Sequence, residues 1–269
     1  MKSIVEKIFE SSPFLRFIFL RIRNQLKVDG NPCIAENIHF SGNKVFISGK
    51  SNALLCAKSS FLRQCVVRIE GSGNSTAIKD TSTIYGENHQ TVFIAGNENC
   101  IIVGKNCTLR KVSFFIRGNR NKIIIEDNCS LYAAQFHIEQ DENEIHIGSG
   151  TTFHGREEHS IQVAVDEGSR VQVGKDCMLS HGVQIRSTDS HSIVDETGVR
   201  LNPASDVEIG NHCWLGLQSI LLKGTVVGAH CVIGAGAVCS KKYVKPNCVI
   251  AGNPASIVKE KIDWGRKLI

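Results

Sequence analysis

Residues 209–239 read IGNHCW-LGLQSI-LLKGTV-VGAHCV-IGAGAV-C, in blocks of six. The first residue of every block is apolar, the fifth is small, and glycine stands second in four of the five complete blocks. Six residues suffice for one short strand and one corner, and three such units close a triangular coil. The pattern therefore predicts a parallel β-solenoid whose large apolar side chains fill the interior. We expect the glycines to relax the corner dihedral angles.

The same rhythm continues toward the N-terminus with a longer period. Apolar residues recur every 22 positions in three sets, and Gly-Asn pairs at 96–97 and 118–119 keep step with them. A 22-residue coil is the same triangle with a longer corner. The three sets are Ile94, Ile116 and Ile138; Val103, Ile125 and Ile147; and Leu109, Leu131 and Phe153.

The eleven cysteines follow this frame as well. Their number is odd and no CxxC occurs, which argues against both a disulfide framework and a zinc ribbon. We expect them to be small interior residues in a reducing cytoplasm. Five of them lie four positions after an apolar repeat residue: Cys107, Cys129, Cys177, Cys213 and Cys231.

Composition and charge exclude several classes. With 269 residues, 42% of them hydrophobic and 21% charged, the chain is long enough for one large globular domain. The net charge of +5 is concentrated at the two ends, in residues 1–27 and 241–269, and the body is mildly acidic. A nucleic-acid binder usually has a basic body with stacking aromatic residues, so we expect no nucleic acid. Basic ends fit a phosphate-bearing ligand or an anionic membrane surface.

The repeat is interrupted once. From Ile185 to Ile209 the chain takes 24 residues where one block needs six. A solenoid accommodates such an insertion as a loop that projects from a corner, so residues 186–208 predict an extended loop. The loop is polar where it begins, and it contains His191.

Three motifs carry a family resemblance: Asp-Ser-His-Ser-Ile at 189–193, Asn-Pro-Ala at 202–204, and the tail Ala-Gly-Asn-Pro-Ala at 251–255. With the hexapeptides they resemble the acyltransferases of the hexapeptide-repeat, left-handed β-helix superfamily, and most closely its bacterial polysaccharide O-acetyltransferases. The resemblance is clearest over residues 171–258. It implies an all-β solenoid, a left-handed parallel β-helix that transfers acetyl from acetyl-CoA to a hydroxyl of a capsule or lipopolysaccharide. It also implies a homotrimer with CoA sites between neighbouring rods, a glycan acceptor and no metal.

The resemblance also assigns roles to individual residues. His191 corresponds to the catalytic base, Trp214 to an aromatic side chain beside the thioester, and Asp189 to a residue that orients the loop or the imidazole. A neutral imidazole suits the task, because a sugar hydroxyl is a poor nucleophile until a base accepts its proton. The family pattern has Asp where this chain has Tyr243, which we expect to contact acceptor or cofactor instead. The cofactor-binding residues that the resemblance implies are Gly216, Leu217, Ala235, Lys241, Lys242, Tyr243, Asn253 and Pro254.

The two ends of the chain predict separate elements. Residues 1–30 form a helical segment, residues 31–254 the β-helix, and residues 255–269 a short amphipathic helix. Residues 1–27 predict a cap over the open end of the solenoid or an oligomer contact, and a peripheral contact with the inner membrane is the alternative. We expect the protein to be cytoplasmic, because no secretory signal is evident.

Three other functions compete with the leading hypothesis. The first is an acetyltransferase of the same fold that acts on a small sugar, a nucleotide-sugar or an antibiotic. The second is a zinc lyase of the γ-carbonic-anhydrase kind, which needs three converging histidines and would start from His154 and His159. The third is a purely structural solenoid, which leaves the histidine-bearing loop unexplained.

Overall fold

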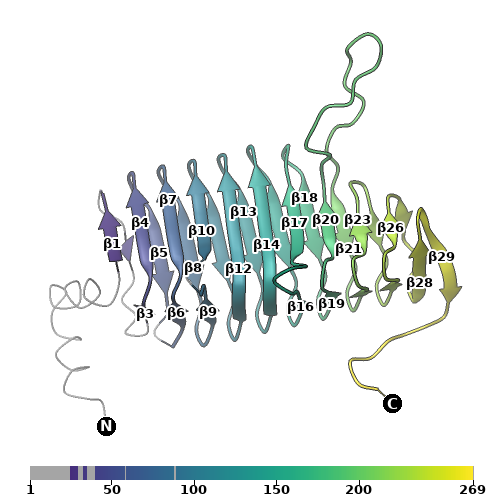
Figure 1. Cartoon of the computed structure of the whole chain (residues 1–269), viewed down its shortest axis with the longest axis horizontal. Helices are drawn as coiled ribbons and strands as arrows, with labels where there is room; N and C mark the ends of the chain where they lie inside the picture. Colours follow the sequence, from purple (N-terminus) through teal and green to yellow (C-terminus); the bar gives the residue numbers. More distant parts are fainter. Residues whose placement is uncertain (1–24, 30–32, 35–39, 58, 88, 269) are drawn as a thin grey trace.

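The chain winds into a long rod of stacked β-coils (Figure 1). The computed structural model describes residues 25–29, 33–34, 40–57, 59–87 and 89–268. Each coil contributes one strand to each of three faces, and all neighbours within a face pair in parallel. This arrangement confirms the predicted parallel β-solenoid with triangular coils.

The first face is formed by β1 (Gln25–Val28), β4 (Lys44–Ser48), β7 (Val66–Glu70), β10 (Gln90–Ala95), the second halves of β12 (Thr108–Arg117) and β14 (Ser130–Glu139), β17 (Ile161–Val165), β20 (Gln184–Arg186), β23 (Ile220–Leu221) and β26 (Val238–Cys239). The second face is formed by β2 (Cys33–Ile34), β5 (Ala53–Cys56), β8 (Ser75–Ile78), β11 (Cys100–Val103), β13 (Lys122–Ile125), β15 (Glu144–Ile147), β18 (Arg170–Val173), β21 (Val207–Ile209), β24 (Val226–Val227) and β27 (Lys242–Tyr243). The third face is formed by β3 (Phe40–Ser41), β6 (Phe61–Arg63), β9 (Thr83–Tyr85), the first halves of β12 and β14, β16 (Thr152–His154), β19 (Met178–Ser180), β22 (Trp214–Leu215), β25 (Val232–Ile233) and β28 (Cys248–Gly252).

The register follows the sequence period. In the hexapeptide region Ile209 pairs with Val227 and Leu215 with Ile233, 18 residues apart. In the N-terminal coils Ile94 pairs with Ile116 at the 22-residue spacing. The paired apolar side chains are buried and form one continuous core along the rod. The spacing of apolar residues in the sequence therefore equals the register in which the strands pair.

The cysteines occupy the interior as predicted. The ten cysteines described with their side chains are all free, and nine of them are buried. The backbone N–H of Cys213 points to the sulfur of Cys177 one coil earlier, at 3.4 Å. Burial raises the pKa of Cys65 to about 12, so this thiol stays protonated at neutral pH.

The corners depend on glycine for a different reason than we predicted. Gly210 and Gly216, which stand second in their blocks, do not have a positive φ. A Cβ on Gly216 would instead lie 2.7 Å from the carbonyl oxygen of Ile233 in the next coil. The positive φ falls two residues later, at His212 and Gln218. At the second position of a block, glycine is therefore needed for the close approach of two coils rather than for its dihedral freedom.

The longer N-terminal corners hold buried asparagines that bond along the rod. Asn74, Asn99, Asn121 and Asn143 are each almost completely buried. The side-chain oxygen of Asn121 accepts the backbone N–H of Asn143 at 2.9 Å and its amide at 3.0 Å. The amide of Asn121 donates to the carbonyl of Gln140 at 2.8 Å. This asparagine ladder satisfies the polar groups that the corners bury.

The C-terminal end differs from the prediction. Residues 255–260 form β29 (Ala255–Glu260), antiparallel to β28, and not a helix. Residues 261–268, which we call the C-terminal strap, run back along the corner between the second and third faces without regular structure, and Arg266 reaches Thr152 at 2.7 Å. Tertiary contacts of Trp264 and Arg266 with the solenoid hold this segment instead of helical hydrogen bonds.

The predicted N-terminal helix lies mostly in residues 1–24, outside the described residues. Residues 25–28 at its end form strand β1, which pairs with β4. Within the described part of the chain, no helix has the length and apolar character needed to cross a bilayer.

Candidate active site

The predicted loop leaves the rod between β20 and β21 and projects far from it (Figure 1). Its base is held by Asn202, a buried residue. The Asn202 amide donates to Asp189 Oδ2 and to the backbone carbonyl of His191, both at 2.8 Å. Its side-chain oxygen accepts the N–H of Ile193 at 2.6 Å. One buried amide thus fixes the backbone at His191 and Ile193 and holds the side chain of Asp189.

Asp189 positions the loop rather than the imidazole. Its carboxylate forms an ion pair with Lys223 Nζ at 2.5 Å, on the corner of the following coil. The hydrogen bonds from Lys223 and Asn202 lower the pKa of Asp189 below its usual value. An ionised Asp189 therefore ties the loop to the rod near neutral pH. Sequence analysis missed Lys223, although it stands 18 residues before Lys241 in the same repeat frame.

The His191 side chain is exposed at the foot of the loop. It lines a cavity of about 400 Å³ on the first face, together with side chains of β14, β17 and β20. Among the described residues, no hydrogen bond to the imidazole ring is found. Arg186 beside it donates to Ser190 Oγ at 3.1 Å. An imidazole with unengaged nitrogens on a fixed backbone is free to accept a proton from a bound hydroxyl.

Trp214 lies on the third face, whereas the loop leaves the first. Its indole N–H donates to Ser180 Oγ at 3.2 Å, and its ring centre lies 6.1 Å from that of Trp264 in the C-terminal strap. The cavity at His191 does not include Trp214 among its lining residues. Within one chain, then, the structure does not bring the two predicted catalytic side chains together.

Five of the predicted cofactor residues line one edge of the rod. Gly216, Leu217 and Ala235 stack at the corner between the third and first faces, where the N–H of Gly236 donates to the carbonyl of Leu217 at 2.8 Å. Asn253 and Pro254 continue this edge as the exposed turn between β28 and β29, joined by a cis peptide bond. This edge therefore presents backbone N–H and C=O groups from several successive coils, with which an extended ligand could form hydrogen bonds.

The two lysines lie on the opposite edge of the first face. Lys241, just before β27, and Lys242, its first residue, are exposed. They lie on the same edge of the rod as the base of the loop and Lys223. Tyr243 departs from its prediction, because its side chain is buried and its hydroxyl donates to the carbonyl of Ala255 at 3.0 Å. Tyr243 is a core residue that anchors β29, so its ring does not face a groove that could hold acceptor or cofactor.

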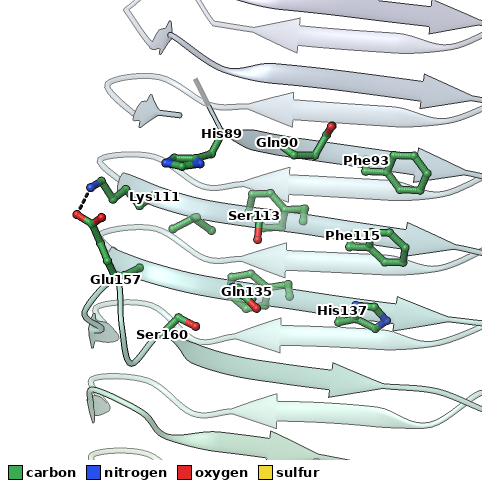
Figure 2. A pocket seen from close by; sticks show the side chains of 14 residues that line it. His89, Gln90, Phe93, Lys111, Ser113, Phe115, Gln135, His137, Glu157 and Ser160 are labelled. Atoms are coloured by element: carbon green, nitrogen blue, oxygen red, sulfur yellow. Dashed lines mark hydrogen bonds and ion pairs between the residues drawn. The ribbon is translucent and has the colours of Figure 1, made fainter. Parts of the chain in front are cut away.

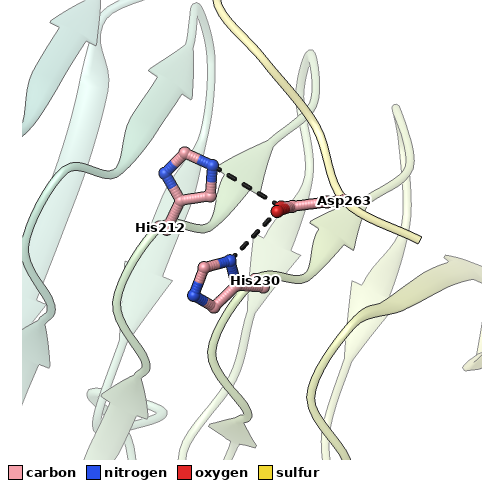
Figure 3. A group of neighbouring side chains, drawn as sticks. All are labelled: His212, His230 and Asp263. Carbon is pink, nitrogen blue, oxygen red and sulfur yellow. Dashed lines mark hydrogen bonds and ion pairs between the residues drawn. The ribbon is translucent and has the colours of Figure 1, made fainter. Parts of the chain in front are cut away.

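His212, His230 and Asp263 form a cluster with the geometry of a metal site, since their ligand atoms lie within 4.8 Å of one another (Figure 3). Both ring nitrogens of His212 already face acceptors: Asp176 at 2.7 Å and the carbonyl of Trp264 at 3.1 Å. Partial burial lowers the pKa of His212, but these acceptors outweigh it and raise the pKa above its usual value. The cluster therefore favours a protonated histidine that holds the C-terminal strap. It does not contain His154 or His159, on which the zinc-lyase alternative depends.

Comparison with known proteins is consistent with this geometry. The family model for bacterial transferase hexapeptides (six repeats) matches residues 206–241. A polysialic acid O-acetyltransferase of Neisseria meningitidis is 37% identical over 200 residues, which cover 74% of this chain and 89% of the relative. Two solved structures share the fold at 28% identity: the polysialic acid O-acetyltransferase OatWY (TM-score 0.62, covering 89% of this chain and 93% of that one) and the polySia-specific acetyltransferase NeuO (TM-score 0.60, covering 90% and 89%).

Proposed function

This chain belongs to the family of the polysialic acid O-acetyltransferases within the hexapeptide-repeat bacterial transferases, and on this basis we propose that it transfers acetyl from acetyl-CoA to a hydroxyl of a bacterial capsule polysaccharide. The observation that carries the proposal is His191: its ring nitrogens make no hydrogen bond within the part of the chain that the structure describes, its backbone is held by Asn202, and it stands at the end of a cavity on the first face. Polysialic acid is the first acceptor to test, because the similar proteins are named for it.

The reaction requires one base and one oxyanion donor. His191 accepts the proton of the sugar hydroxyl while the oxygen attacks the thioester carbonyl of acetyl-CoA. The new C–O bond forms, the C–S bond breaks, and the CoA sulfur leaves with the proton returned by the imidazolium. A backbone N–H at a corner stabilises the tetrahedral oxyanion. No covalent enzyme intermediate is required.

We propose that the working unit is a homotrimer, and two observations support it. The loop beyond His191 carries apolar side chains that are more than half exposed: Ile193 (56%), Val194 (52%), Val199 (59%) and Leu201 (60%). Such a projecting apolar tip is stable when a neighbouring rod covers it. Trp214, on another face of its own chain, would reach the His191 of a neighbour, which explains why one chain separates the two side chains.

The two edges of the first face supply contacts suited to the donor. Backbone groups at Gly216, Leu217 and Ala235 can pair with the pantetheine amides, and Lys241 and Lys242 can attract the phosphates. Acetyl-CoA is made in the cytoplasm, so we also propose that the reaction takes place there.

A small acceptor is the alternative. An enzyme for a monosaccharide or an antibiotic needs the coils around the His191 cavity, from β14 onward, and has no use for the earlier coils from β1 to β11. The similarity to the Neisseria relative extends over 200 residues, whereas the loop and the hexapeptide blocks, residues 186–239, comprise 54. The extent of this match favours the polymer.

The test is acetyl transfer by purified protein to polysialic acid, read by mass spectrometry as the gain of one acetyl group per modified sugar. His191→Ala should lower kcat by roughly 10²–10⁴ because the general base is lost. Ser192→Ala is the matched control, since it lies next to His191 on the same exposed loop. Transfer that persists undiminished in His191→Ala would rule out the proposed mechanism. If the wild-type protein acetylates no polymer but does acetylate a small sugar, the alternative is correct.

A further inference from the structure

The first face carries a groove that begins far from His191 and ends beside it. One cavity, of about 560 Å³, is lined by side chains of β10, β12 and β14 (Figure 2). The cavity at His191, of about 400 Å³, is lined by β14, β17 and β20. Gln135 and His137 line both cavities, so the two adjoin at β14.

Two outward-facing columns form the floor of this groove. In the first column the parallel register aligns Phe93, Phe115, His137, Ala164 and Arg186 on successive coils. The rings of Phe93 and Phe115 are nearly parallel with centres 4.9 Å apart, and those of Phe115 and His137 lie 4.5 Å apart. This aromatic column runs along the rod toward the foot of the loop.

The second column is polar. The register places Ser113, Gln135, Gln162 and Gln184 beside the aromatic column, one on each coil. Each glutamine amide can both donate and accept hydrogen bonds. Hydroxyl-rich sugars need such partners, and the C–H faces of a pyranose ring need an apolar surface. Aromatic side chains with a few convergent polar groups are the composition of a small-molecule site, and here the two columns combine on the coils of Phe115 and His137.

Charges of both signs line the two cavities: the cations Lys111 and Arg186, and the carboxylates of Glu139, Glu157 and Asp166. At its N-terminal end Lys111 is held by Glu87 at 3.0 Å and by an ion pair with Glu157. His137 Nε2 lies 3.1 Å from Glu139. Arg186, at the His191 end, bonds the hydroxyl of Ser190, and no ion pair of its guanidinium is found among the described residues. A cation placed beside the catalytic base is suited to a carboxylate on the acceptor sugar.

We infer that this groove binds the acceptor as an extended glycan chain, several sugars beyond the one that is acetylated. The five coils from Phe93 to Arg186 span roughly 19 Å at the ordinary strand spacing. The inference rests on the proposed function and deepens it, because it assigns the N-terminal coils a role in reading polymer length. A monosaccharide fills only the His191 end, whereas a chain covers both cavities.

The experiment uses size-fractionated polysialic acid as acceptor and the full-length protein. For the wild type, kcat/KM should rise with chain length until the groove is spanned. Phe115→Ala should raise the KM for long chains about tenfold, as expected for the loss of one aromatic contact. Its KM for acetyl-CoA and its kcat/KM on the shortest acceptor should not change.

Phe46→Ala is the matched control, because Phe46 is an exposed ring in the same outward column but lines neither cavity. It should behave as wild type with every fraction. An equal loss in Phe46→Ala and Phe115→Ala, or a Phe115→Ala variant with an altered oligomeric state, would overturn the inference and make the face a subunit interface instead.

Failure of the inference and failure of the proposed function are distinguishable. A wild-type enzyme with equal kcat/KM on short and long chains overturns the groove and leaves the function intact. A wild-type enzyme that acetylates no fraction overturns both.

Discussion

The coils of 22 residues and the coils of 18 residues build the same triangle with different corner chemistry. In the longer coils, strands such as β12 and β14 run for ten residues, and buried asparagines bond from coil to coil. In the shorter coils most strands have two residues, and the corners consist of backbone packed directly on backbone. Both kinds of coil place glycine where backbone lies against backbone, most tightly in the longer coils, and the longer coils add side-chain hydrogen bonds along the rod. The longer coils also leave room on the outer surface for a groove.

The largest effect should come from removing the space at a corner of the longer coils. Gly118 has φ +130°, and a Cβ there would lie 1.9 Å from the carbonyl oxygen of Gln140. Gly118→Ala should cost about 4 kcal/mol or more of unfolding free energy, because backbone must move on two coils. Gly236→Ala is the control in the shorter coils, with φ +66° and no atom within 4 Å, and should cost about 1 kcal/mol. Urea unfolding measures both, and equal losses would contradict the contrast.

The asparagine ladder gives the second test. Asn121→Ala leaves the amide groups of Asn143 and the carbonyl of Gln140 without these partners in a buried site, and should cost about 3 kcal/mol. In the shorter coils Thr225 makes one such bond, to the carbonyl of Cys239 at 3.0 Å. Thr225→Val keeps the shape and should cost about 1 kcal/mol. If the two variants unfold at the same urea concentration, the ladder adds nothing to the longer corners.

The smallest effect concerns the C-terminal strap, which covers the shorter coils. His212 faces Asp176, the carbonyl of Trp264 and Asp263, with His230 and Arg266 nearby. Because its pKa is raised on folding, its contribution is complete below about pH 6.5 and is lost as pH rises through the folded-state value. The loss should be roughly 0.5 kcal/mol after allowance for solvent screening.

Hydrogen exchange of residues 261–268, expressed as a protection factor, measures this effect. The protection factor should fall about twofold between pH 6 and pH 8, with β20 as the internal reference. The His212→Gln variant should show no such fall. Protection that is independent of pH in the wild type would mean that the proton on His212 does not hold the strap.

The sequence period predicted the ladder well because each side chain in a solenoid packs on the residue one coil away. Ile209 and Val227 show this, since their spacing in the sequence is their pairing in space. The aromatic column could also have been predicted from the sequence, because Phe93, Phe115 and His137 follow the same 22-residue spacing. This outward-facing column was not predicted, because the apolar repeat concerns the inward-facing positions.

The features that could not be predicted from the sequence depend on contacts outside the repeat. Residues 255–260 pair back on β28, and Trp264 packs on His212, which are tertiary contacts with no local signature. Tyr243 follows two lysines in a position that the resemblance made functional, yet it fills the core. For the candidate site, the position of His191 on a projecting loop was predicted correctly. The buried clamp by Asn202 and the separation of Trp214 on another face emerged only from the structure.

The aligned register of the longer coils has a consequence for how such a protein can change over generations. Duplication of one 22-residue unit inserts a complete coil and displaces nothing else, because each coil contacts only its immediate neighbours. Every added unit would lengthen the aromatic and amide columns by one step of about 4.8 Å and leave the His191 end as it is. Gene duplication or deletion can therefore change the number of coils, and with it the length of the proposed groove, while the residues around His191 stay the same.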